Sequence, residues 1–448
     1  MINTAELDVL RAALEKLEAG SADLPHFTPA LDVDAVSGVL QQVAVRMQDN
    51  YPYYHPLYAG QMLKPPHPVA RLAYALSLWI NPNNHALDGG RASTAMEKEC
   101  IVEIGNMFGW RAPLGHLAGG GTMANLEALW IASRLHPGKR VIASEQAHYT
   151  HARICDVLGI PFSAVRCTAA GHMDLAHLDD LLVRGDVGTI VATMGTTGFG
   201  DVDPLPDILE RAENAGIRVH ADAAYGGYFV LASGLGDKTR TAFDCLGRVD
   251  SIVVDPHKHG LQPYGCGCVL FRNPGDGRFY KHDSPYTYFS SEELHLGEIS
   301  LECSRAGASA VALWATHQLL PPVKGGEFSR DLDRCLAAAR DFRSRLDASA
   351  AFHPLMQPEL DIVVYAVDAP DTATASARAK QLFKLAAENN LHLALIELSA
   401  ERLNLYAPNI RANTETVTCL RSVLMKPEHE AWLEPIMEIL EACVRRLG

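Results

Sequence analysis

Short apolar runs rich in β-branched residues recur through the middle of the chain, and segments with helical spacing of apolar residues separate them. The runs cover residues 140–144, 162–167, 188–194, 217–222, 251–255 and 267–272. Strands that alternate with helices in this way pair into a mostly parallel sheet with helices on both faces. The pattern therefore predicts an α/β protein whose ligand binds beyond the carboxyl ends of the strands.

The amino-terminal part of the chain has a different pattern. Residues 1–50 carry apolar side chains at helical spacing, and residues 51–68 are dense in tyrosine, histidine and proline. Proline density excludes a continuous helix in the second segment. We expect it to line a pocket or an interface, or to serve as a connector. Residues 88–103 return to a helical pattern and lead into the main sheet.

The carboxy-terminal part predicts a smaller α+β unit. A helix is expected over residues 301–320, and glycine and proline at 321–327 mark a boundary. Strand patterns follow at 361–367, 391–398 and 416–425, with helices between and after them. These patterns divide the chain into an arm (1–75), a large ligand-binding domain (76–325) and a small carboxy-terminal domain (326–448).

Composition narrows the class of protein. The chain has 448 residues, 48% hydrophobic and 21% charged, which is typical of a globular protein with a large core. Its net charge of -14 argues against nucleic acid or an anionic membrane as a partner. We expect a cytoplasmic protein, because the chain shows no pattern of a leader or a membrane span. Its ten cysteines show neither disulfide nor zinc-ligand spacing, so no metal site is expected.

One lysine follows a buried strand directly. The strand at 251–255 runs into Pro256, His257 and Lys258, and a cluster of ionisable groups at a strand end indicates a site. A partly desolvated lysine amine loses its proton more readily and can form a Schiff base with an aldehyde. The alternative is a solvated loop lysine.

A glycine-rich turn precedes a helix pattern near residue 122. Gly120, Gly121 and Thr122 let the backbone approach a ligand closely, and the helix start offers free N–H groups to an anion. The turn lacks the spacing of a nucleotide-binding loop, so a compact phosphate is the expected ligand. A tight helix entry without any ligand would give the same sequence.

Asp222 ends an apolar strand and is followed by small residues. A carboxylate in such a place needs a cationic partner, such as a protonated ring nitrogen, unless it caps its own turn. Ala224 leaves room for a flat ring, and His148 can stack on the ring's other face. Together with an aldehyde for Lys258 and a phosphate for the glycine turn, these demands describe pyridoxal 5'-phosphate (PLP).

The sequence also resembles the group II PLP-dependent amino-acid decarboxylases of fold type I. The resemblance runs from about residue 51 to the carboxy-terminus, and the motifs that carry it are SEQAH, TMGTTG, HADAAYGG and DPHKHGLQPYG. The DPHK motif, together with LECSRAGASAVALWATHQLLP, is most similar to the bacterial tyrosine-decarboxylase branch. The resemblance to the family implies decarboxylation of an L-amino acid, aromatic or acidic, by a homodimer with active sites at the subunit interface.

The resemblance also assigns roles. It implies that Lys258 forms the internal aldimine and that the phosphate is bound by His257 and by the cup of Gly120, Gly121 and Thr122. It also implies that His148 and Ala224 face the ring and that Asp222 pairs with the ring nitrogen. Thr197 would contact the cofactor or substrate, and Arg421 would lie near the substrate carboxylate. Asp255 departs from the asparagine of the animal enzymes, and an acid there repels a phosphate unless it faces away.

The proton donor is expected on a loop after the lysine. Tyr286 is the first candidate for this role, Tyr288 lies in the same segment, and Tyr264 is a candidate from the bacterial branch. Three other readings stay open at this stage: a carbon–carbon lyase, an aminotransferase and a non-catalytic homologue that binds PLP.

Overall fold

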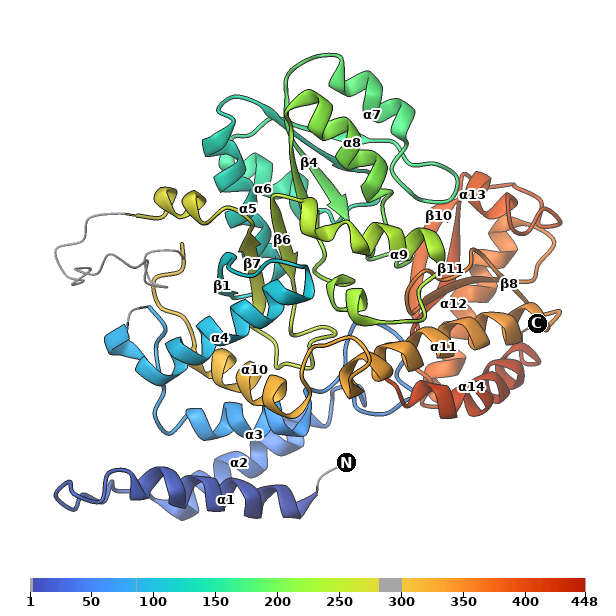
Figure 1. Cartoon of the computed structure of the whole chain (residues 1–448). Coiled ribbons are helices and arrows are strands. Elements are labelled where there is room, and N and C mark those ends of the chain that lie inside the picture. Colours follow the sequence, from blue (N-terminus) through green and yellow to red (C-terminus); the bar gives the residue numbers. More distant parts are fainter. Residues whose placement is uncertain (1–2, 86, 282–299, 448) are drawn as a thin grey trace.

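The computed structural model describes residues 3–85, 87–281 and 300–447 of the chain, and a seven-stranded sheet forms its centre (Figure 1). The strand order is β1-β7-β6-β5-β4-β2-β3. The strands are β1 (Leu114–Ala118), β2 (Arg140–Ser144), β3 (Phe162–Val165), β4 (Val187–Thr193), β5 (Arg218–Asp222), β6 (Ser251–Val254) and β7 (Gly267–Phe271). Strands β2 to β6 pair in parallel, while β7 runs antiparallel to both β6 and β1. The expected mostly parallel sheet is confirmed.

Helices cover both faces of this sheet because its strands are apolar on both sides. Ile252 and Val254 of β6 belong to one core cluster, whereas Val253 belongs to another that includes Ala128 and Ile131. Successive side chains of a strand point to opposite faces, so each face needs its own helical layer. The helices in this part of the chain are α3 (Pro68–Ser77), α4 (Arg91–Met107), α5 (Gly121–Leu135), α6 (Thr150–Leu158), α7 (Leu175–Leu182), α8 (Leu205–Ala215), α9 (Asp237–Asp244) and α10 (Gly307–Leu319).

The carboxy-terminal part builds a second, four-stranded sheet in the order β10-β11-β9-β8. Its elements are α11 (Glu327–Asp347), β8 (Phe352–Pro354), β9 (Ile362–Val367), α12 (Thr372–Glu388), β10 (Ala394–Ser399), α13 (Ala400–Asn404), β11 (Thr416–Val423) and α14 (His429–Val444). Val363 and Tyr365 of β9 pack into a core under α12 and α14, while Ile362 and Val364 join the core of the large sheet. The small α+β unit is therefore present, and the domain bounds proposed from the sequence stay a prediction.

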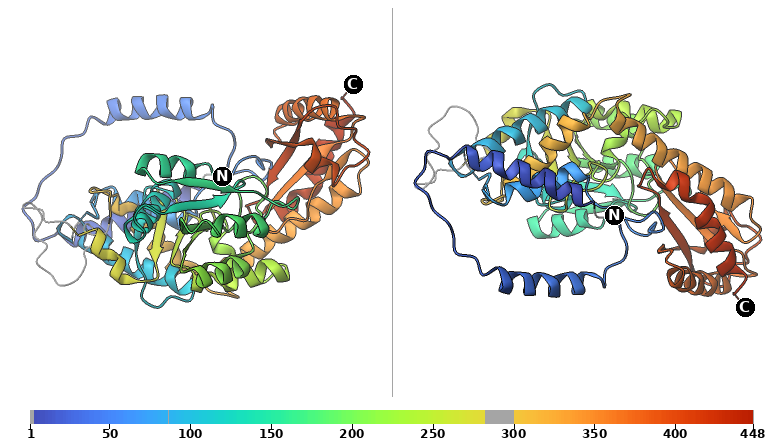
Figure 2. Two further views of the ribbon diagram at one scale, coloured as in Figure 1. Left: turned by 90° about the horizontal axis from the view of Figure 1, so that it is seen from above. Right: turned by 90° about the horizontal axis from the view of Figure 1, so that it is seen from below.

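The amino-terminal segment divides into two helices and an extended stretch. Helix α1 (Thr4–Ala19) packs near α3, while α2 (Val33–Met47) has no buried residue. Figure 2 shows α2 standing away from the rest of the molecule, joined to it by long connections. The aromatic stretch that follows lies against the small sheet, where the Ala59 N–H donates to the His392 carbonyl over 2.9 Å.

One strand and the starts of two helices differ from the sequence expectation. Strand β1 was not predicted, because its segment Leu114–Ala118 holds a glycine and a histidine in place of a β-branched run. The sequence after the strand at 140–144 predicts a helix that opens at residues 145–148, whereas α6 begins at Thr150. Helix α10 begins at Gly307 rather than at residue 301, because the chain before it is tied elsewhere by side-chain contacts.

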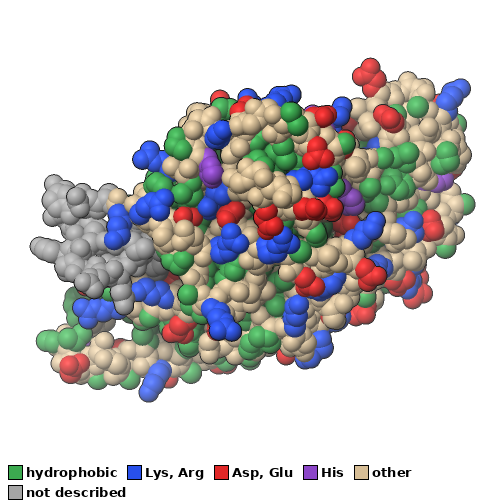
Figure 3. All heavy atoms as spheres, turned by 45° about the horizontal axis from the view of Figure 1, so that its top comes forward, with side chains coloured by type: hydrophobic (Ala, Val, Ile, Leu, Met, Phe, Trp, Pro, Cys, Tyr) green, Lys and Arg blue, Asp and Glu red, His purple; other side chains and the backbone are tan. Residues whose placement is uncertain are grey.

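The exterior adds two observations. Within residues 3–85, 87–281 and 300–447, no helix combines the length and apolarity that crossing a membrane requires. Acidic and basic side chains are interspersed over the face shown in Figure 3.

Candidate functional site

A cavity of about 700 Å³ opens beyond the carboxyl ends of β4, β5 and β6, beside the start of α5. A volume of this size is typical of a site for a cofactor together with a small substrate. Most of the residues predicted from the sequence line this cavity: Gly120, Gly121, Thr122, His148, Thr197, Asp222, Ala224, His257, Lys258 and Tyr264. The fold thus brings together residues that are far apart in the chain.

The glycine turn forms one wall of the cavity. Gly120 has a φ of +151°, which only glycine adopts readily, and α5 begins at Gly121 without a side-chain cap. A Cβ at Gly121 would lie 2.6 Å from Asp255 Oδ2, so no larger residue fits there without a shift. The uncapped first turn of α5 leaves N–H groups available to an anion.

Lys258 lies in the turn after β6 and reaches the same wall. Its Nζ is 3.1 Å from Asp255 Oδ2, so the acid that departs from the animal pattern faces the lysine. His257 donates from Nδ1 to the Cys266 carbonyl over 2.9 Å, which turns Nε2 toward Asp255 at 3.6 Å. Burial lowers the pKa of His257. Asp255 is therefore close to both basic side chains of its own turn.

Asp222 ends β5 and is buried at the cavity wall. Its Oδ2 lies 2.8 Å from His151 Nε2, and its Oδ1 accepts from the Ala224 N–H over 3.2 Å. Burial acts to raise the pKa of Asp222, but the hydrogen bond from His151 and the charge of Lys258 outweigh it, so the pKa lies below its usual range. The sequence analysis did not identify His151. The signal available was its spacing, three residues after His148 at the start of a helix.

His148 and Thr197 also line the cavity. His148 Nδ1 accepts from the Thr150 N–H over 3.3 Å, which leaves the proton of the neutral ring on Nε2. Burial lowers the pKa of His148, so the ring favours the neutral form that stacks well on another ring.

Arg421 does not line the cavity. It lies buried in β11, where its guanidinium donates to the carbonyls of Thr197 and Gly198 and to Gln61 Oε1, over 2.7, 3.0 and 3.1 Å. The side chain thus supports the Thr197 wall from behind.

Of the three tyrosine candidates for the proton donor, Tyr264 lies within the described residues. Tyr264 lines the cavity, and its hydroxyl donates to the Met62 carbonyl over 3.1 Å. Partial burial raises the pKa of Tyr264 to about 12, so the phenol holds its proton at neutral pH. Tyr286 and Tyr288 lie outside the described residues.

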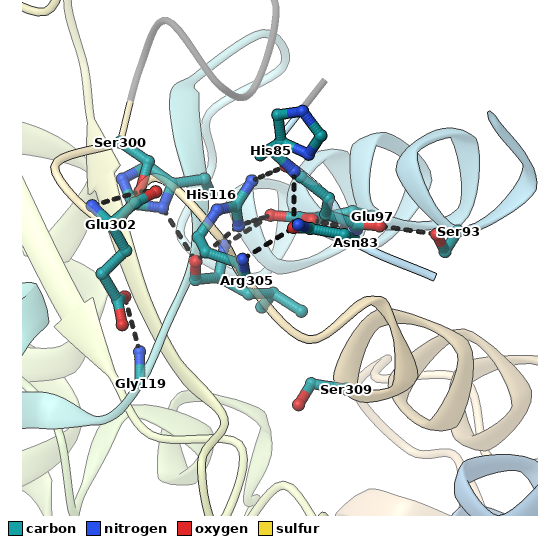
Figure 4. Close-up of polar contacts among 12 residues, drawn as sticks. Asn83, His85, Ser93, Glu97, His116, Gly119, Ser300, Glu302, Arg305 and Ser309 are labelled. Atoms are coloured by element: carbon teal, nitrogen blue, oxygen red, sulfur yellow. Dashed lines mark hydrogen bonds and ion pairs between the residues drawn. The ribbon is translucent and has the colours of Figure 1, made fainter. Parts of the chain in front are cut away.

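A buried polar network fixes the rim beside the glycine turn (Figure 4). Arg305 contacts Glu97 Oε1 at 2.6 Å and the Leu117 carbonyl at 2.8 Å. Glu302 accepts from the Gly119 N–H over 2.9 Å and lines the cavity. These contacts attach the chain just before α10 to the end of β1, and they explain why this stretch is not helical.

The residues of the cavity fit PLP. The lysine, the uncapped helix start and the Asp222 carboxylate match the aldehyde, the phosphate and a protonated ring nitrogen. Among the described side chains, Asp255 Oδ1 and Thr193 Oγ1 are buried at this wall without a hydrogen-bond partner, as expected where a polar ligand binds.

Comparison with known proteins decides the family. The model of the pyridoxal-dependent decarboxylase conserved domain matches residues 55–368. The chain belongs to this decarboxylase family. The cofactor of this decarboxylase is accordingly PLP, and the expectation of a PLP-dependent amino-acid decarboxylase is confirmed.

Individual relatives agree with this assignment. The decarboxylase is 30% identical to a probable L-tyrosine/L-aspartate decarboxylase of Methanothrix thermoacetophila, over 76% of this chain and 84% of the relative. It is also 30% identical to a probable L-aspartate decarboxylase of Halobacterium salinarum, over 71% and 84%.

Solved structures share the fold. A crystal structure of mouse CSAD superposes with a TM-score of 0.80 at 20% identity, covering 96% of this chain and 91% of that one. A crystal structure of Oryza sativa TDC with PLP and tryptamine gives 0.81 at 17% identity, covering all of both chains. The fold type I expectation is confirmed.

Proposed function

We propose that this decarboxylase converts an L-amino acid with an aromatic side chain into its amine and carbon dioxide, and that Lys258 is the residue that binds the cofactor covalently. When bound, PLP supplies an electron-withdrawing ring that weakens bonds at the substrate α-carbon. The remaining chemistry falls to the residues around the cavity.

The support for Lys258 is its place in the cavity. It lines the cavity together with the glycine turn and Asp222, and no other lysine is among the lining residues that the structure describes. Borohydride reduction of the PLP-loaded enzyme, followed by peptide mass spectrometry, should place the pyridoxyl label on the peptide that contains Lys258. A label on another lysine, or none, would refute the assignment.

The charge of the cavity carries the proposal on the substrate. Histidines aside, the acidic and basic side chains among the described lining residues are one lysine, Lys258, and three carboxyl groups, Asp222, Asp255 and Glu302. The side-chain carboxylate of an acidic substrate needs a further cation, and the described lining offers no lysine or arginine besides Lys258. Apolar lining residues such as Met123 and Leu126 suit an aromatic ring.

A panel of amino acids tests the substrate. Purified, PLP-loaded enzyme is incubated with each amino acid, and amine and carbon dioxide are measured. We expect tyrosine or tryptophan to give the highest kcat/KM. We also expect Glu302→Gln to raise kcat/KM for aspartate relative to that for tyrosine. A higher kcat/KM for aspartate than for any aromatic substrate in the unmodified enzyme would refute the proposal.

Two further roles belong to the same proposal. Arg421 and Thr197 orient the substrate carboxylate, with Arg421 acting from behind the Thr197 carbonyl. Tyr286 donates the proton to the α-carbon after carbon dioxide leaves, and Tyr264 is the alternative donor. The high pKa of Tyr264 suits a phenol that keeps its proton until then.

We also propose a cytoplasmic homodimer. Helix α2 supports the dimer, because it buries none of its side chains in this chain and exposes Val36, Val39, Leu40 and Val43. Sedimentation analysis should give twice the 48.7 kDa of one chain. The free state of the ten cysteines supports a reducing compartment.

A further inference from the structure

A second histidine of α6 lies behind the Asp222 carboxylate, at the wall of the cavity. His151 Nε2 is 2.8 Å from Asp222 Oδ2, and the side chains are 1% and 7% exposed. The His151 N–H donates to the His148 carbonyl over 3.2 Å, so the first turn of α6 carries both histidines. His148 lines the cavity, whereas His151 is not among its lining residues.

The state of the His151 ring follows from its other nitrogen. Nδ1 is buried and has no hydrogen-bond partner among the described residues. A proton on Nδ1 would therefore be left without an acceptor, whereas a ring protonated on Nε2 alone satisfies the contact with Asp222. His151 thus acts as a hydrogen-bond donor to the carboxylate.

The carboxylate is held from two directions. His151 donates to Oδ2, and the Ala224 N–H donates to Oδ1. The charge of Lys258 also favours its charged form. Without the His151 donor, a buried carboxyl with a single neutral donor would favour the protonated form, which cannot pair with a cationic nitrogen.

We propose that His151 is a positioning residue for the cofactor: its Nε2–H keeps Asp222 ionised and oriented toward the ring nitrogen of PLP. The inference rests on the proposed role of Asp222 as the partner of that nitrogen. His151 touches neither cofactor nor substrate and acts through the carboxylate alone.

A pair of amide variants tests the proposal. The amide nitrogen of His151→Gln can occupy the place of Nε2 and reach Asp222, whereas that of His151→Asn lies near the place of Nδ1 and cannot. The readouts are the PLP dissociation constant and the 15N chemical shift of PLP labelled at its ring nitrogen. We expect H151Q to keep a protonated ring nitrogen and nearly unchanged affinity. We expect H151N to lose the protonated signal and to bind PLP roughly 10-fold more weakly or worse.

Two controls separate this role from fold stability and from the proposed function. His317→Leu removes an equally buried histidine outside the cavity lining, whose Nδ1 lies 2.5 Å from Glu103 Oε2. Its thermal stability should fall while both PLP readouts stay unchanged. Asp222→Ala should lose the protonated signal. If D222A keeps it, the proposed role of Asp222 fails and the inference with it. If D222A loses it but H151N matches the unmodified enzyme, the inference alone is overturned.

Discussion

Replacing Arg305 with methionine should strongly destabilise the chain. The guanidinium lies 2.6 Å from Glu97 Oε1, 2.8 Å from the Leu117 carbonyl and 2.9 Å from the Asn84 carbonyl. The side chains of Arg305 and Glu97 are 5% and 1% exposed. Methionine fills much of the same volume, so the change removes mainly the charge and the donors.

The size of the effect follows from what Glu97 retains. Breaking a buried ion pair on one side costs about 3–5 kcal/mol, because the other charge stays buried without compensation. Glu97 still accepts from Asn84 Nδ2 over 2.5 Å and from the Leu117 N–H over 2.8 Å. We therefore expect a loss near the lower end, about 3 kcal/mol in the free energy of unfolding.

Urea unfolding followed by tryptophan fluorescence measures this loss. The double variant E97Q/R305M removes the uncompensated charge and should be more stable than R305M. The control is Arg334→Met, since Arg334 pairs with Glu430 over 3.0 Å at the surface and should cost at most about 1 kcal/mol. PLP affinity should also fall in R305M, because Leu117 lies two residues before Gly119 of the cavity. An R305M variant no less stable than R334M, or a double variant no better than the single one, would refute the reasoning.

Three further predictions follow. Gly121→Ala should weaken PLP binding at least tenfold, because its Cβ would meet Asp255 at 2.6 Å; Gly38→Ala in α2, with open space around the new Cβ, should leave titrated PLP affinity unchanged. Burial lowers the pKa of His220 from its usual 6.5 to about 3, so the unfolded chain takes up this proton first, and the stability should fall as the pH drops from 6.5 to 3. In acid unfolding, H220Q should flatten this dependence, whereas a substitution of the exposed His26 should not. Tyr286→Phe should abolish amine formation while Tyr264→Phe should keep most of it, and the reverse outcome would assign the proton to Tyr264.

The main sheet and most of the cavity wall were predictable because local pattern decides them. β-Branched runs mark strands β2 to β7, and in a mostly parallel sheet the polar residues at the carboxyl ends of the strands meet at one edge. Strand β1 escaped because its pairing with β7 compensates for a sequence that has little strand preference of its own. Its buried His116 bonds through Nε2 to Glu127, at 2.7 Å, from a helix later in the chain.

The partners of the site residues were harder to predict, since they depend on side chains that meet only in the folded chain. His151 and Asp222 are 71 positions apart, and Arg305 and Glu97 are 208 apart. Periodicity places each residue on an element but says nothing about which polar group it faces across the core. The buried position of Arg421 behind Thr197 was missed for the same reason.

The partners of the cavity carboxylates explain how an anionic phosphate can bind beside them. Each has a partner within the protein: Asp222 meets His151, Asp255 meets Lys258, and Glu302 accepts from the Gly119 N–H. A carboxylate with a partner repels an incoming anion less than a free one does. The uncapped first turn of α5 then offers the phosphate its N–H groups. The acid at position 255 borders Gly121 of this turn, and it is compatible with PLP because Lys258 Nζ lies 3.1 Å from its Oδ2.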